Sequence, residues 1–480
     1  MLVPFLRDSA IYTFPAIISR GLSFFLIPVY TQVLAPSDFG ALDMLLIFGN
    51  LVNLTVALEV SQGVARYAPA EKEARAKTLY ASSALWFTVF CYALFLVLSM
   101  YYAPVLSVWI IGRAGFDAVV RIGMVYITIN GIFYLVQNQF RWELRSAQYA
   151  TVSLLVAVVT AAFAVSLTYF LHWGLKGFLY GLIAGPLVGC LYGLYHLRDL
   201  FRFCFSSGHL KDLLAFSAPL VPSGIAVFIT IYIDRFMINH FMTLNDVGLY
   251  GVGMRIASIV GFCLVGFRGA LTPLIYKHYK ETNTPWQLER IFRYFLAFAL
   301  TVFAGVSVFS PEIMAIMTTP TYYAAAPVII YLVPGILLSN MYIFAPGIAI
   351  AKKNMLTLWI NVGGALANTI LNYLFIPVFG ISGAAGATLL GYMGVFGAHM
   401  FFSQRLYPVP HDWRRIAVAA GGITCLTIAG LHISWPSIVG IPLKAAIVCL
   451  GGVYLVTLGI VPKNEIQDAL FFCRQRFIKP

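Results

Sequence analysis

The stretch Tyr149-ATVSLLVAVVTAAFAVSLTYF-Leu171 contains no charged side chain in 23 residues. An α-helix rises about 1.5 Å per residue and the hydrocarbon core of a bilayer is about 30 Å thick, so about 20 apolar residues cross it once. We expect fourteen such spans: 10–33, 39–62, 79–100, 118–139, 149–171, 176–197, 213–238, 247–273, 291–310, 326–349, 355–376, 383–403, 413–433 and 438–461. The sequence therefore predicts an all-α, multi-pass membrane protein.

The composition supports this prediction, since 60% of the residues are hydrophobic and 10% are charged. The loops are too short to fold as domains, and they contain no GxxxxGK[ST] motif, so we expect neither ATP hydrolysis nor another enzymatic activity. The seven cysteines show no disulfide or metal-ligand spacing, and we expect no metal and no cofactor.

Basic residues predict the orientation, because Lys and Arg are retained in cytoplasmic loops. With the N-terminus inside, the cytoplasmic segments hold 23 of the 31 basic residues. This distribution favours an even number of spans with both termini in the cytoplasm. The net charge of +13 then reflects topology and contact with anionic lipid headgroups, not binding of nucleic acid.

A weak internal repeat divides the first twelve spans into two halves. Ser37-Asp-Phe-Gly40 matches Asn245-Asp-Val-Gly248 at a displacement of 208 residues, and Gly174-Leu-Lys-Gly177 matches Gly380-Ile-Ser-Gly383 at 206. Chance recurrence of turn residues is the alternative explanation. We interpret the nearly equal displacements as two six-helix pseudo-repeats forming N and C lobes around a central cavity. The predicted domains are residues 1–205, residues 206–405, and residues 406–480, which add two helices and a basic cytoplasmic tail.

Ionisable side chains inside a bilayer are costly and therefore are candidates for function. We place eight of them at membrane depth: Arg20, Asp43, Glu59, Arg121, Asp234, Arg235, Arg255 and Arg268. Five positive and three negative groups favour an anionic substrate such as a pyrophosphate, which the planar fork of arginine can bind through two hydrogen bonds. By depth and charge, Arg20 and Arg255 are the first candidates to line the cavity, one from each half.

The other candidates have structural explanations of equal or greater weight. Asp234 and Arg235 either contact substrate or form a salt bridge to another helix. Asp43, Glu59, Arg121 and Arg268 lie near span ends, where they can extend to the headgroup region. Asn361, Asn368 and Asn372 form one helical stripe, for which hydrogen bonds between helices are the commoner explanation than ligand binding.

Three segments carry a resemblance to a known family. They are Asn372-YLFIPVFGISGAAGA-Thr388, Asp246-VGL-Tyr250 and Pro28-VYTQVLAPSDF-Gly40. They resemble polysaccharide transporters, including O-antigen (Wzx-type) flippases, of the multidrug/oligosaccharidyl-lipid/polysaccharide exporter superfamily, over essentially the whole chain. The motifs indicate the family well and the substrate poorly.

The resemblance implies a flippase in the bacterial inner membrane. It would move polyprenyl-pyrophosphate-linked oligosaccharide repeat units from the cytoplasmic to the periplasmic leaflet by alternating access, during O-antigen, lipopolysaccharide or other surface polysaccharide biosynthesis. Membrane lipids, and the polysaccharide polymerase with its chain-length machinery, are the partners it implies. Coupling to H⁺ or Na⁺ through Asp43 or Asp234 stays open, since no spacing supports it, and the membrane potential is a further driving force.

Three alternatives remain open. A lipid II flippase shares the architecture, a multidrug/cation antiporter shares the superfamily, and a non-transporting scaffold for glycosyltransferases would tolerate loss of Arg20 and Arg255. The excess of positive charge in the spans argues against export of cationic drugs.

Overall fold

The computed structural model describes residue 18 and residues 21–22, 24–261, 271, 275, 278–433 and 437–461 of the 480-residue chain. In these ranges the secondary structure is helical, without a strand. The helices of eight or more residues, with α2, are α2 (Ile27–Val33), α3 (Pro36–Thr55), α4 (Val60–Tyr67), α5 (Ala74–Tyr101), α7 (Asp117–Trp142), α8 (Ser146–Val165), α9 (Gly174–His196), α10 (Ser207–Ser217), α11 (Leu220–Phe241), α12 (Leu244–Ala257), α14 (Thr284–Val308), α15 (Ser310–Met317), α16 (Ala326–Met341), α18 (Asn354–Leu406), α19 (Trp413–Leu431) and α20 (Ser437–Thr457). Two four-residue helices are α6 (Ala103–Leu106) and α17 (Gly347–Ile350).

Among the described residues, ten helical segments are long and apolar enough to cross a membrane, or eleven if the bent pair α3 and α4 counts as one span. The 52-residue segment Met355–Leu406 is one of the ten, although two predicted spans lie in it. Predicted spans 10–33 and 247–273 run into residues outside the described ranges. The chain is thus a multi-pass helical membrane protein, and the count of fourteen spans and the location of the termini stay predictions.

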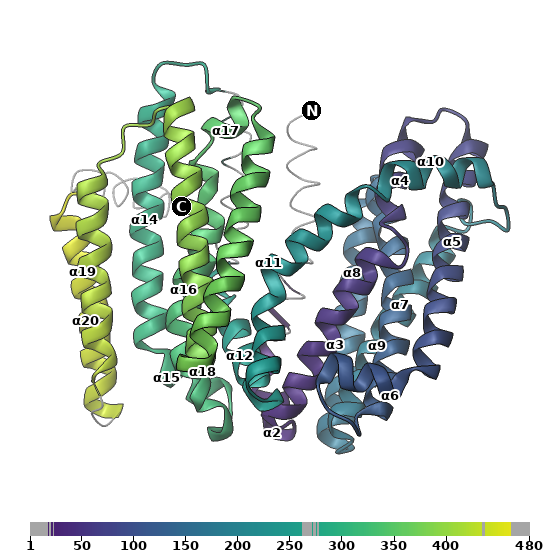
Figure 1. Cartoon of the computed structure of the whole chain (residues 1–480), viewed down its shortest axis with the longest axis horizontal. Helices are drawn as coiled ribbons and strands as arrows, with labels where there is room; N and C mark the ends of the chain where they lie inside the picture. Colours follow the sequence, from purple (N-terminus) through teal and green to yellow (C-terminus); the bar gives the residue numbers. More distant parts are fainter. Residues whose placement is uncertain are drawn as a thin grey trace, which may run out of the picture. The chain divides into compact units, whose positions relative to one another are not determined.

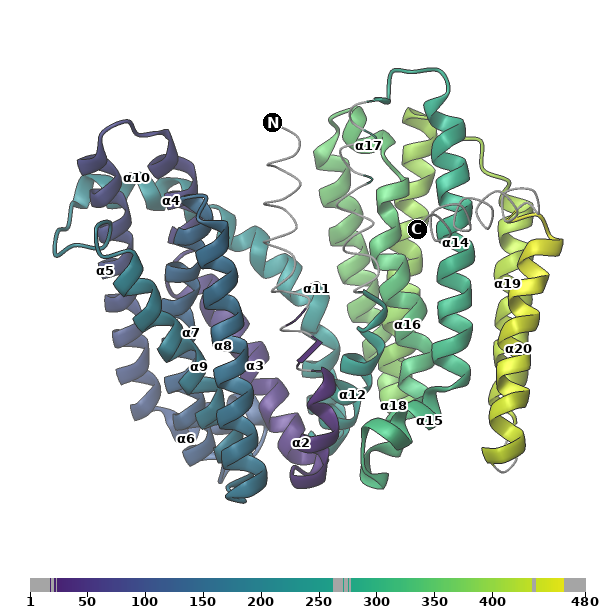
Figure 2. The same ribbon diagram turned by 180° about the vertical axis from the view of Figure 1, so that it is seen from behind.

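Two compact units make up the chain: unit 1 is Met1–Val252 with Met317–Tyr322, and unit 2 is Gly253–Ile316 with Tyr323–Pro480. In unit 1, α9 packs against α7 and α8, as Figures 1 and 2 show. Gly177, Gly181, Gly185, Gly189 and Gly193 recur every fourth residue along α9 and are buried. Small residues at this spacing let helix backbones approach closely within a membrane, which explains the tight packing of α9.

The predicted repeat is visible in how two helices begin. The Asp38 carboxylate accepts a hydrogen bond from the Ala35 backbone N–H at 3.1 Å, before α3. The Asp246 carboxylate accepts one from the Thr243 backbone N–H at 3.0 Å, before α12. In each pair the carboxylate lies three residues after the N–H that it accepts from, and the second pair is displaced from the first by 208 positions. The two helices therefore begin with the same capping hydrogen bond at matching positions of the predicted repeat.

The beginnings of α3 and α12 also pack against each other through glycine. A Cβ atom on Gly40 would collide with the Leu244 carbonyl oxygen, and one on Gly248 would collide with the Pro36 carbonyl oxygen. Leu244 is Pro36 displaced by 208 positions, as Gly248 is Gly40. The contact is therefore reciprocal, and we call it the reciprocal glycine contact.

The two glycines that begin the second predicted correspondence share a backbone conformation. Gly174 and Gly380 have φ angles of 56° and 61°, in the left-handed region that glycine adopts without strain. Gly174 begins α9, and Gly380 bends α18 between its two predicted spans. In each predicted half, a glycine with a positive φ angle therefore lies in the connection just before the sixth span.

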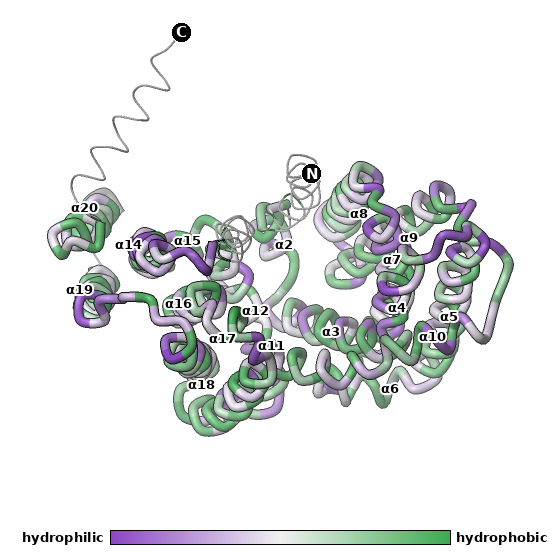
Figure 3. The backbone as a smooth tube through the Cα atoms, turned by 90° about the horizontal axis from the view of Figure 1, so that it is seen from above, coloured by the Kyte–Doolittle hydropathy of each residue, from purple (hydrophilic) through white to green (hydrophobic). Residues whose placement is uncertain are grey.

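In unit 2, α14 packs against α16, α19 and α20, and α19 lies beside α20 in both views of the ribbon (Figures 1 and 2). Lys444 of α20 is 4% exposed and forms an ion pair with Glu312 of α15. The sequence analysis did not place these two charges among the intramembrane groups. Hydrophobic residues dominate the helices of both units, while hydrophilic stretches concentrate in the connections (Figure 3).

The compact units divide within α12, between Val252 and Gly253, whereas the repeat predicts a division near residue 205. The reason is that α10 and α11 pack on unit 1. Gly63 of α4 lies against the Leu213 backbone of α10, and the Asn50 amide of α3 donates to the Tyr232 hydroxyl of α11 at 3.1 Å. The division into 1–205, 206–405 and 406–480 stays a prediction about the repeat.

Candidate functional site

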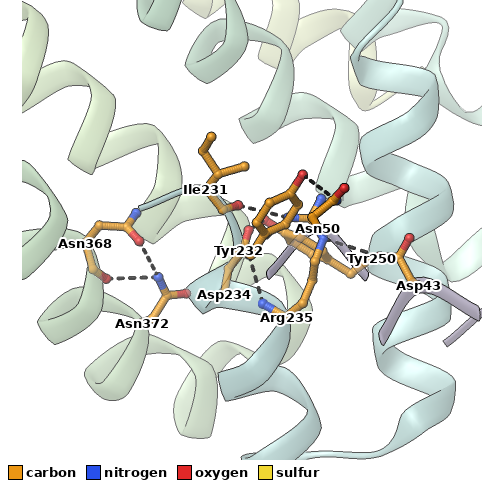
Figure 4. Close-up of polar contacts among 9 residues, drawn as sticks. All are labelled: Asp43, Asn50, Ile231, Tyr232, Asp234, Arg235, Tyr250, Asn368 and Asn372. Carbon is orange, nitrogen blue, oxygen red and sulfur yellow. Dashed lines mark hydrogen bonds and ion pairs between the residues drawn. The ribbon is translucent and has the colours of Figure 1, made fainter. Parts of the chain in front are cut away.

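A buried charge network joins α3 and α11 within unit 1 (Figure 4). α3 carries Asp43 and α11 carries the neighbours Asp234 and Arg235, so three of the predicted site residues lie together. Their side chains are 14%, 5% and 8% exposed, respectively. Charges this deep in a membrane protein need partners, which the network supplies.

Arg235 is the centre of the network. Its Nε lies 3.3 Å from Asp43 Oδ2, and its Nη1 lies 3.1 Å from Asp234 Oδ1. Nη1 also donates to the Ile231 carbonyl oxygen at 3.1 Å. The guanidinium carbon lies 5.6 Å and 5.5 Å from the ring centroids of Tyr232 and Tyr250, within the range of cation–π attraction.

Asp234 has further donors. The Tyr250 hydroxyl donates to its Oδ2 at 2.5 Å, and the Arg235 backbone N–H donates to its Oδ1 at 2.8 Å. Tyr250 comes from α12, so the network connects three helices. The sequence analysis missed its role, although Tyr250 ends the motif Asp246-VGL-Tyr250 on which the family resemblance rests.

The charge balance of the network is negative, because two carboxylates surround one guanidinium. The guanidinium group of Arg235 contacts Asp43, Asp234 and the Ile231 carbonyl oxygen. It is therefore not free to donate two hydrogen bonds to a phosphate. These contacts occupy Arg235 within the protein and do not leave it for recognition of a pyrophosphate.

The asparagine stripe lies in unit 2, on the first arm of α18. Asn372 is fully buried and its amide donates to both the backbone oxygen and the side-chain oxygen of Asn368, each at 2.9 Å. The Asn368 amide donates to the Ala387 carbonyl oxygen on the second arm at 3.3 Å. These bonds hold the two arms together, as the structural explanation predicts, while Asn361 is exposed. Figure 4 shows the Asn368–Asn372 pair.

The remaining candidates are dispersed. Arg255 is half-buried on the part of α12 that belongs to unit 2, and Arg121 is exposed on α7. Arg20 and Arg268 lie outside the described residues. The pairing of Arg20 with Arg255 across a cavity therefore stays a prediction.

Glu59 occupies a break between α3 and α4, which are bent by 46°. Leu58 and Glu59 have φ angles of 49° and 51°, which is strained backbone for residues other than glycine. Glu59 Oε2 is buried and has no hydrogen-bond partner in the part of the chain that the structure describes. The void beside it measures about 10 Å³, which leaves room for one water molecule and none for a sugar or a pyrophosphate.

The arrangement of helices is that of a known membrane-protein fold. The structure resembles the lipid II flippase MurJ in its inward closed conformation, with a TM-score of 0.71 over 94% of this chain and 98% of that one, at 15% sequence identity. Long apolar helices, with ion pairs buried among them, define the class as a multi-pass helical membrane protein.

Residues 29–268, half of the chain, match the model of the family described as "Polysaccharide biosynthesis protein". The chain belongs to this family. It is 24% identical to the probable low-salt glycan biosynthesis flippase Agl15 of Haloferax volcanii over 55% of this chain and 57% of that protein. It is 25% identical to the succinoglycan biosynthesis transport protein ExoT of Rhizobium meliloti over 50% of this chain and 47% of that protein. The chain thus matches about half the length of each of these two relatives.

Proposed function

We propose that this protein is a flippase for lipid-linked glycans in the synthesis of a surface polysaccharide. Its cargo would be a polyprenyl-pyrophosphate-linked oligosaccharide repeat unit, of O-antigen or another polymer, moved from the cytoplasmic to the periplasmic leaflet by alternating access. Membership of the polysaccharide biosynthesis family carries this proposal. The names of the two relatives, a glycan biosynthesis flippase and a succinoglycan transport protein, support it.

The buried charges support different roles for different residues. Arg20 and Arg255 remain the proposed contacts for the pyrophosphate. Arg235 already binds Asp43 and Asp234, so we assign to it a structural role within the network. The excess of negative charge there makes Asp43 and Asp234 the proposed groups for coupling to H⁺ or Na⁺, and outward movement of an anionic cargo also gains about 2.3 kcal/mol per charge for each 100 mV of potential.

The test is the lipid-linked oligosaccharide pool, sorted by membrane leaflet, in cells depleted of the protein. Accumulation of one lipid-linked repeat unit facing the cytoplasm, with loss of surface polymer, is the expected result. Arg255→Ala should reproduce this loss while the protein still inserts normally, and the exposed Arg121→Ala should not. Wild-type polymer in the Arg255 variant would remove it from the cargo site, and an unchanged lipid pool would refute the flippase proposal.

The likeness in fold to the lipid II flippase MurJ makes lipid II the second candidate cargo. The same experiment distinguishes the two, because depletion would then accumulate the cell-wall precursor and arrest growth. A drug exporter would instead show increased sensitivity to cationic compounds with an unchanged oligosaccharide pool. A scaffold would lose surface polymer only when the protein itself is absent, not when Arg20 or Arg255 is replaced.

A further inference from the structure

An open hollow of about 690 Å³ lies in unit 2, between the two ends of α18. Its lining is Lys352, Lys353, Met355, Leu356, Phe402, Arg405 and Leu406. The first four residues come from the turn after α17 and the beginning of α18, and the last three come from the final turns of α18. We call it the Lys353–Arg405 hollow. Charge distribution along the sequence predicts that it faces the cytoplasm.

The walls of the hollow are held in place by a close contact. The Gly347 backbone N–H donates to Ser403 Oγ at 2.8 Å, and a Cβ atom on Gly347 would collide with the Ser403 backbone. This contact fixes α17 against the last turns of α18. The basic residues that follow α17 are therefore kept beside Arg405, without any need for an ion pair.

The turn that presents the lysines is unusual. Lys353 N–H donates to the Ile348 carbonyl oxygen and Lys352 N–H donates to the Ala349 carbonyl oxygen, which is the pattern of a Schellman cap. Lys352 has a φ angle of 57° at the position where such a cap normally has glycine. Strained backbone of this kind is common at ligand-binding sites, which makes the turn a candidate for one.

The charges in the hollow are all of one sign. Three of its seven lining residues are cations and none is an acid. Lys352, Lys353 and Arg405 form no ion pair within the described ranges, although residues 262–270 and 462–480 lie outside them. The guanidinium carbon of Arg405 lies 4.2 Å from the ring centroid of Phe401, which orients the side chain while leaving its donors for a ligand. Gathering three cations without a counter-charge calls for an anion.

The rest of the lining is apolar, and this determines what kind of anion fits. Met355, Leu356, Phe402 and Leu406 supply a hydrophobic surface beside the cations, and Met355 is 67% exposed. A soluble phosphate would use the cations only, whereas a phospholipid would place its headgroup on them and its chains on the apolar residues. Basic pockets at the ends of transmembrane helices are typical sites for anionic headgroups.

We propose that the Lys353–Arg405 hollow binds the phosphate group of an anionic membrane lipid. The bound phosphate would connect the beginning of α18 to its end, and so stabilise the bend at Gly380 between its two arms. A ligand that binds only the folded protein stabilises it in proportion to its occupancy, so binding is measurable as increased stability. The proposal is independent of the cargo.

The test uses the full-length protein in neutral detergent, with phosphatidylglycerol, phosphatidylcholine or inorganic phosphate added. Retained lipid is counted by native mass spectrometry, and the unfolding temperature is recorded for each addition. The site variant is Lys353→Gln/Arg405→Gln. The matched control, Lys72→Gln/Arg75→Gln, removes two exposed cations from unit 1 on the same predicted side of the membrane.

We expect wild type and control to retain phosphatidylglycerol in preference to phosphatidylcholine and to gain stability from it. The site variant should bind phosphatidylglycerol roughly thirtyfold more weakly, which corresponds to about 1 kcal/mol per basic residue. The variant Lys353→Arg/Arg405→Lys keeps both charges and should retain the lipid, which separates loss of charge from loss of folding.

Equal binding of phosphatidylglycerol by site variant and control would overturn the proposal, as would equal retention of the two lipids by the wild type. Stabilisation by inorganic phosphate alone, as strong as that by phosphatidylglycerol, would assign the hollow to a soluble phosphate and overturn the lipid as its ligand.

Discussion

Replacement of Arg235 by methionine is the sharpest test of the charge network. The change removes the one cation between Asp43 and Asp234 while keeping the length of an unbranched side chain. At an effective dielectric constant of about 20, contacts of 3.3 Å and 3.1 Å correspond to about 5 kcal/mol of Coulomb attraction each. Most of this offsets the desolvation of the three charges, and removal of one partner from a buried pair typically destabilises a protein by about 3–5 kcal/mol. We expect Arg235→Met to lose that amount.

The assay is unfolding of the purified protein in mixed micelles by titration with sodium dodecyl sulfate. The double variant Asp43→Asn/Arg235→Met also neutralises the carboxylate that faced the guanidinium, and it should recover at least about 1 kcal/mol relative to the sum of the single changes. Arg121→Met is the control, since it makes the same chemical change at an exposed site. The reasoning fails if Arg235→Met and Arg121→Met unfold at the same concentration of sodium dodecyl sulfate. It also fails if the effects of Asp43→Asn and Arg235→Met on the free energy of unfolding are additive.

Three further predictions concern packing, pH and the last two helices. Gly248→Ala should destabilise the protein by about 1–3 kcal/mol, because the new Cβ atom would collide with a backbone carbonyl oxygen. Gly386→Ala is the control, since its Cβ atom would meet nothing within 4 Å and should leave stability unchanged. Equal unfolding temperatures of the two variants would contradict this prediction. Burial lowers the pKa of His411, in the connection between α18 and α19, from its usual 6.5 to about 4. Between about pH 4 and 6.5 the unfolded chain therefore binds more protons than the folded chain, so stability should fall as the pH falls from about 6.5 to about 4. His411→Phe should flatten the dependence of stability on pH across that window. An unchanged dependence would show that another group causes it. Lys444→Met should loosen α20, seen as faster limited proteolysis, and adding Glu312→Gln should reverse part of the effect; no change in either variant would show that the pair is not an anchor.

Apolar periods in the sequence predicted most helices well, because the thickness of the bilayer fixes their length. Predicted spans 118–139 and 176–197 became Asp117–Trp142 and Gly174–His196. The break inside predicted span 39–62 had no signal, because Leu58 and Glu59 are neither glycine nor proline and yet adopt left-handed backbone. Predicted span 213–238 became two helices, α10 and α11, which meet at Ala218–Pro219.

The candidate site was less predictable than the helices. Charge inside predicted spans marked Asp43, Asp234 and Arg235 as candidates, but the ion pair between Asp43 and Arg235 joins positions 192 residues apart, which no local spacing encodes. The sequence neighbours Asp234 and Arg235 pair with each other, although successive residues on a helix point in different directions. A long, flexible arginine can reach back to its neighbour once both are buried.

The reciprocal glycine contact has the geometry of a symmetric dimer interface, although it lies within one chain. In a two-fold dimer, residue i of one subunit contacts residue j of the other, and j contacts i in return. Pro36 and Gly40 stand in this relation to Leu244 and Gly248. The predicted duplication implies that this contact corresponds to the interface between two identical six-helix chains. A side chain at either glycine would then push apart both copies of the contact.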